Sequence, residues 1–125
     1  MRRDKYHGIL LDLAFLNPKY PENYKIFNCI QSGNWNLIGI EIDYDKIDNV
    51  ISEIQLNMNE DQPFYVHFYN DEDLIVVFKE KRFNVSNHES SWKEIIEYGK
   101  TKGIPEKQLD FWPNRYQDEI HYFKK

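Results

Sequence analysis

The chain has 125 residues, a formal net charge of −5, 41% hydrophobic residues and 30% charged residues. This composition excludes an intrinsically disordered chain, and the length fits one domain, residues 1–125, whose core needs no metal or disulfide. Nucleic acid is a disfavoured partner, because its binding depends on Lys and Arg side chains that neutralise phosphates, and no dense basic stripe is present, although the fold could still assemble a local basic face.

The first half of the chain predicts three strands and one helix. Residues 6–16 place apolar side chains on both faces, which indicates a central strand with Asp12 near its middle. Two prolines make residues 17–23 a loop. The other predicted elements are a hairpin of strands 24–31 and 35–43 and an amphipathic helix over about 44–59.

The second half repeats this arrangement. Alternating and β-branched residues predict strands at 64–69, 74–78 and 82–85. A helix follows over about 90–102. Ser91 and Glu94 have the spacing of a capping box, while Gly103 and Pro105 end the helix.

The order of elements, β-β-β-α-β-β-β-α, predicts an α+β fold. We expect an antiparallel, hairpin-rich sheet of about five to six strands with the two main helices on one face. The segment 111–123 has no clear period and is rich in aromatic residues, so it is expected to form a C-terminal arm.

Cys29 is the only cysteine and lies among apolar residues, so we expect a buried, unreactive thiol. A lone cysteine also argues against a secreted disulfide scaffold. The N-terminus lacks a signal-peptide cleavage site, and no apolar run reaches the ~18 residues of a membrane span. These features predict a cytoplasmic protein that does not bind a membrane.

The C-terminal segment has the residue types of a ligand-binding surface. Aromatic walls with a few converging polar groups form pockets, and an arginine side chain can hold an anion in a bidentate pair. The residues predicted to bind a ligand are Trp112, Arg115, Tyr116, Glu119, Tyr65 and Tyr69. The alternative is an arm that seals the edge of the core while Arg115 pairs with a nearby acid.

A second interpretation assigns catalysis to Asp12, His67 and His121. A carboxylate within an apolar strand needs a partner, and such sites occur both in active centres and in structural pairs. If the strands of Asp12 and His67 were neighbours, these two residues would share a polar surface with Tyr65 and Tyr69. The strand pairing is not readable from the sequence.

Motifs for known chemistry are absent. The serines lack a nucleophile elbow, and the five glycines form neither a phosphate-binding loop nor a dinucleotide fingerprint. The four histidines are scattered, and the acidic turn 70–73 lacks the spacing of a calcium loop. We therefore predict no cofactor and no metal.

Two functions remain open. The first is a small non-enzymatic binding or regulatory domain that engages a protein partner or small ligand through an aromatic and polar surface. Its negative charge suits a basic partner, as in an inhibitor or immunity-like role. The second is a small hydrolase or isomerase in which Arg115 holds an anionic substrate. An uncovered hairpin edge also favours a homodimer.

Overall fold

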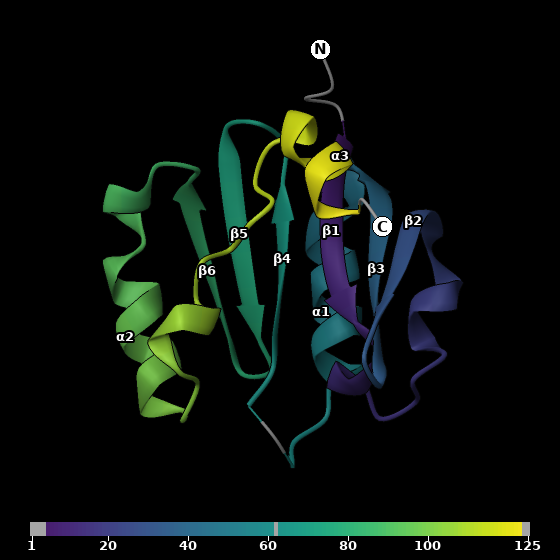
Figure 1. Ribbon diagram of the computed structural model, residues 1–125, viewed down its shortest axis with the longest axis horizontal. Coiled ribbons are helices and arrows are strands. Elements are labelled where there is room, and N and C mark those ends of the chain that lie inside the picture. Colours follow the sequence, from purple (N-terminus) through teal and green to yellow (C-terminus); the bar gives the residue numbers. More distant parts are fainter. Residues whose placement is uncertain (1–4, 62, 124–125) are drawn as a thin grey trace.

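The computed structural model describes residues 5–61 and 63–123 and shows one six-stranded antiparallel sheet (Figure 1). The strand order is β2-β3-β1-β4-β5-β6, so the predicted central strand is central. The α+β class and the antiparallel sheet are confirmed. The strands are β1 Lys5–Leu11, β2 Lys25–Ser32, β3 Trp35–Asp43, β4 Tyr65–Tyr69, β5 Asp73–Phe78 and β6 Lys81–Ser86; the helices are α1 Ile47–Asn57, α2 Lys93–Thr101 and the short α3 Glu119–Tyr122.

Each face of the sheet carries its own core. Leu10 of β1 belongs to the cluster that contains Ile51 and Ile54 of α1. Its neighbour Ile9 points the other way, into the cluster that contains Ile95 of α2. The two helices therefore lie on opposite faces, and the expectation of both on one face is wrong in this detail. The order of elements does not decide on which side of a sheet each connection passes.

The first strand ends earlier than expected. β1 stops at Leu11, and Asp12–Ala14 form a 3₁₀ turn, so Asp12 follows the strand instead of lying in its middle. Asp12 is 8% exposed and accepts hydrogen bonds from the backbone N and side-chain Nδ2 of Asn36, at 3.1 and 3.0 Å. The carboxylate thus has the partner that its burial requires.

The edge strand β2 differs from the sequence interpretation at Cys29, whose thiol is exposed. A β-bulge between Ile26 and Asn28 gives Phe27 no partner on β3. The Phe27 ring lies over Gly39, where an added Cβ would be 2.6 Å from its Cζ atom. The bulge and the edge position leave an apolar-looking stretch only partly covered, which is why the prediction of a buried thiol is wrong.

The start of α2 also differs from the prediction. The helix begins at Lys93, and Ser91 does not cap it, because its hydroxyl donates to the carbonyl of His88 at 2.7 Å. None of the helices in the described part of the chain is long and apolar enough to cross a membrane.

The C-terminal arm, residues 111–123, lies on the same face as α2. It follows the face of β4 and ends at α3, in front of β1 (Figure 1). Phe111 is fully buried and its ring meets those of Tyr65 and Trp92, each with centroids 5.3 Å apart. The arm is therefore part of the second core and places its polar residues against the sheet.

Candidate functional site

Three alternate residues of β4 bind the C-terminal segment in succession. Because side chains alternate along a strand, Tyr65, His67 and Tyr69 point to one face. The Tyr65 hydroxyl donates to the carbonyl of Gln108, just before the arm. His67 Nε2 lies 2.8 Å from the carbonyl oxygen of Pro113, and the Tyr69 hydroxyl donates to Glu119. This face of β4 is thus covered by its own chain.

Burial sets the ionisation of these residues. Desolvation lowers the pKa of His67 to about 4, although its contact with the Pro113 carbonyl opposes the shift. The ring is therefore neutral at pH 7, and Nε2 carries the hydrogen that it donates. Burial also raises the pKa of the Tyr65 hydroxyl, with a smaller contribution from Asp110. The Tyr69 pKa is raised by burial and then by Glu119.

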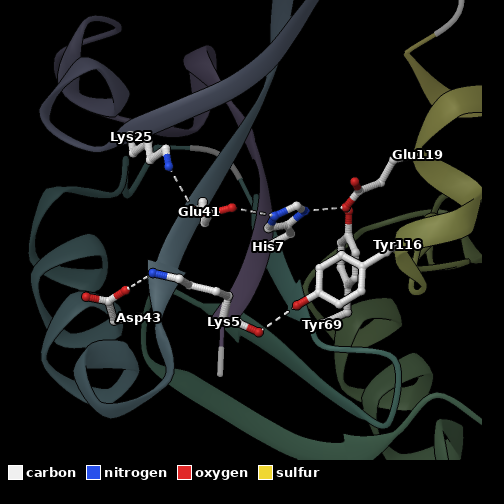
Figure 2. Close-up of polar contacts among 8 residues, drawn as sticks. All are labelled: Lys5, His7, Lys25, Glu41, Asp43, Tyr69, Tyr116 and Glu119. Atoms are coloured by element: carbon white, nitrogen blue, oxygen red, sulfur yellow. Dashed lines mark hydrogen bonds and ion pairs between the residues drawn. The ribbon is translucent and has the colours of Figure 1, made fainter. Parts of the chain in front are cut away.

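A second polar cluster surrounds His7 of β1 (Figure 2). The His7 ring is nearly buried, with Nδ1 2.6 Å from Glu119 Oε2 and Nε2 3.1 Å from Glu41 Oε1. Ionised carboxylates only accept hydrogen bonds, so both contacts are satisfied together when both ring nitrogens carry hydrogen. The geometry therefore fits an imidazolium between two carboxylates.

Glu41 links this cluster to the edge of the sheet. Its second carboxylate oxygen accepts a hydrogen bond from Lys25 Nζ of β2 at 3.0 Å. Lys25 and, to a smaller extent, His7 hold the pKa of Glu41 below its usual value. The result is a charge chain of four residues in which basic and acidic groups alternate, Lys25–Glu41–His7–Glu119.

Aromatic rings enclose the His7 imidazole. Phe27 stacks on it with ring centroids 4.1 Å apart and planes inclined by 23°, and Tyr116 meets it edge-on at 4.7 Å. The Tyr116 hydroxyl donates to the backbone carbonyl of Lys5 at 2.6 Å (Figure 2). The rings thus exclude solvent from the imidazole and, when it is protonated, can stack on it as a cation.

No protein-family model, curated protein or solved structure matches this chain. Its chemistry therefore has to be argued from its own contacts. Among residues 5–61 and 63–123, no group of three or more His, Cys, Asp or Glu side chains has an arrangement that could hold a metal ion.

The outward side of the arm carries exposed aromatic rings, whereas its inward side makes the buried polar contacts. Trp112 is 40% exposed, and its ring meets that of Tyr122 with centroids 5.6 Å apart. We call these two residues the aromatic pair. Ring contacts continue inward from Tyr122 to Phe123 and from Phe123 to Phe27. The aromatic pair is thus joined through consecutive rings to the cage around His7.

Other predicted ligand-binding residues have structural partners. The Arg115 guanidinium forms a bidentate pair with Asp118, three residues later, with both N···O distances 3.1 Å. This is the pairing expected for a sealing arm. Tyr65 and Tyr69 point from β4 toward the C-terminal segment, whereas Tyr116 and Glu119 point from the arm toward β1, and all four hold the arm to the sheet.

The residues of the catalytic interpretation do not come together. Asp12 follows the end of β1, whereas α3 and His121 lie over the other end, near His7. The rise of about 3.3 Å per strand residue puts Asp12 roughly 16 Å from His7. His67 is buried beneath Pro113, and His121 is exposed. Tyr65, His67 and Tyr69 therefore share one face of β4, as expected, but Asp12 does not join them.

The central residues of the cluster escaped the sequence interpretation. His7, Glu41 and Lys25 were not predicted as site residues, although His7 directly faces Glu41 in the β1–β3 register. The available signal was the alternation of His7 with Ile9 on one face of a strand apolar on both sides. This alternation points to Glu41 only when the pairing of β3 with β1 is known.

Proposed function

We propose that the chain is a non-enzymatic binding domain that captures a protein partner on the outer side of its C-terminal arm. The observation that carries this proposal is the aromatic pair, an exposed tryptophan held by ring contact on an ordered segment. Tryptophan and tyrosine dominate the binding energy of protein interfaces, and a pre-positioned ring loses little conformational entropy on binding. Ile120, 75% exposed on α3, adds apolar surface to the arm.

The arrangement of the side chains that could act as acids or bases supports a binding role over catalysis. His7 and His67 are buried, and each makes hydrogen bonds within the chain. In the parts of the chain that the structure describes, no buried side-chain nitrogen or oxygen lacks a partner. A hydrolase or isomerase needs its acid and base within reach of one substrate, but Asp12 follows one end of β1 whereas His121 lies on α3, which contacts β1 at His7 near its other end.

A partner with a basic surface fits the charge of the chain. The net charge is −5, and two carboxylates lie near the arm. Asp71 accepts a hydrogen bond from the backbone N of Tyr116 at 2.7 Å. Asp110 lies close enough to Tyr122 to reinforce the effect of burial, which raises the Tyr122 pKa to about 12. Acidic groups beside an apolar anchor favour a basic partner and speed its association.

The test is comparative capture by purified chain variants. Trp112→Ala removes the exposed ring, and Leu56→Ala is the matched control, because Leu56 is exposed on α1 at the opposite face of the sheet. We expect specific partners to be captured by the wild type and by Leu56→Ala and to be lost with Trp112→Ala. Binding should also weaken with salt. Equal capture by all three proteins would refute the proposal.

A further inference from the structure

The His7 cluster has a property that goes beyond a binding surface. Its two carboxylates come from parts of the chain that are far apart, Glu41 from β3 and Glu119 from the C-terminal arm. The ring therefore connects the arm to the sheet. A neutral imidazole has one N–H and one lone pair, so it donates to only one carboxylate and directs its lone pair at the other.

The two carboxylates depend on His7 to different degrees. Glu41 keeps an ion pair with Lys25 when the histidine is neutral. Glu119 keeps only the hydroxyl of Tyr69 among its described hydrogen-bond donors, and its side chain is just 15% exposed. A nearly buried carboxylate without a cation is unfavourable. Loss of the ring proton therefore removes the cation that faces Glu119, and the contact that holds the arm is reduced to a hydrogen bond from an uncharged ring.

We propose that His7 is a proton-operated latch, which keeps the C-terminal arm closed while the ring is protonated and releases its α3 end when the ring is neutral. Release frees Tyr122 from its position beside Trp112 and uncovers Tyr69. The latch thus controls whether the aromatic pair is assembled. The groups that face His7, or lie one contact beyond it, are Glu41, Lys25, Glu119, Tyr69, Tyr116, Phe27 and the Lys5–Asp43 ion pair.

The direction of the pH dependence follows from the contacts. The arm is held by both carboxylate contacts of His7 while the ring carries both protons, and it is held more weakly when rising pH removes one of them. At low pH His67 has the opposite effect on the arm. Protonation of this buried ring beneath Pro113 disfavours the closed arm as pH approaches 4, the lowered pKa of His67.

Hydrogen exchange measured at several pH values tests the latch on the full chain. The amides of residues 116–123 report on the α3 end, and those of β5 in the same sample correct for the intrinsic effect of pH on exchange. We expect protection of 116–123 to fall about tenfold or more relative to β5 as His7 deprotonates, the factor for loss of one charge-assisted hydrogen bond. Constant relative protection would overturn the proposal.

Two variants separate a latch from simple packing. Glu119→Gln can donate or accept, so it pairs with either form of His7, and we expect its arm to stay protected with little dependence on pH. His7→Gln should also remove the dependence. His121→Gln is the control, since His121 is exposed on the same short helix. A pH response that persists in Glu119→Gln, or disappears in His121→Gln, contradicts the latch.

The state of the ring is measurable directly in the wild-type protein. The 15N chemical shifts of a histidine distinguish two protonated nitrogens from one protonated and one bare nitrogen. We expect both His7 nitrogens to be protonated while the arm is closed, and the transition to coincide with the loss of arm protection. A neutral His7 beneath a closed arm would refute the proposal, whatever the variants do.

Discussion

Phe111→Ala is expected to destabilise the whole domain, because the arm forms part of the second core. Phe111 is fully buried and meets the rings of Tyr65 and Trp92. Replacing a buried phenylalanine with alanine costs about 3–5 kcal/mol, including the cavity that remains. Its backbone has a φ of 49°, a left-handed conformation that costs roughly 1–2 kcal/mol in itself. Alanine keeps this strain and loses the burial.

Urea unfolding followed by circular dichroism measures the effect. Typical domains have about 5–15 kcal/mol of unfolding free energy, so the loss is a large fraction of it. With an m-value of about 1–3 kcal/mol per molar urea, the midpoint should fall by roughly 1–5 M. Ile120→Ala is the matched control from the same segment, and since Ile120 is exposed it should change stability by less than about 0.5 kcal/mol.

If Phe111→Ala lowered the free energy of unfolding by less than about 1 kcal/mol with an unchanged m-value, the arm would add little to the core. In that case the ring contacts of Phe111 would be those of a loosely attached tail, and the latch and the binding surface would lose the platform on which both depend.

Three further predictions concern single contacts. Gly39→Ala should destabilise the domain by about 1–3 kcal/mol in thermal or urea unfolding, because its new Cβ would lie 2.6 Å from the Phe27 ring. Asp12→Ala should cost about 1–3 kcal/mol and Asn36→Ala less, because only the first leaves a backbone N–H without its acceptor. The pKa of His67 is about 4 when folded and about 6.5 when unfolded, so the unfolded chain binds more protons and stability falls by up to about 3 kcal/mol from pH 6.5 to 4. His67→Gln should flatten this part of the pH–stability curve, and an unchanged acid slope would contradict the assignment of His67 as buried and neutral.

Local patterns were sufficient for most of the elements. The apolar faces of residues 6–16 correctly indicated a central strand, and the alternation of Tyr65, His67 and Tyr69 correctly placed these side chains on one face. Both inferences need only the two-residue period of a strand. The eight main elements also follow each other in the predicted order.

The remaining features depend on contacts between distant segments. The pairing of β1 with both β3 and β4 brings Glu41 and Tyr69 to either side of His7, and no local pattern encodes that order of strands. Cys29 is exposed because a bulge at Phe27 interrupts the alternation of the edge strand. In both cases the environment of the residue is built by segments that lie far from it in the sequence.

The polar residues beneath the arm also explain how the arm finds its position. An arm held only by Phe111 and its neighbouring rings could shift along the sheet with little change in buried apolar area, because hydrophobic attraction has no direction. The hydrogen bond between His67 and the Pro113 carbonyl and the one between His7 and Glu119 can form together in one alignment of the arm only. A displaced arm would leave the His67 N–H and Nδ1 of His7 without these partners, at a cost of about 1–3 kcal/mol for each unsatisfied buried group. The buried polar contacts therefore select one alignment of the arm, and the same contacts make that alignment responsive to protons.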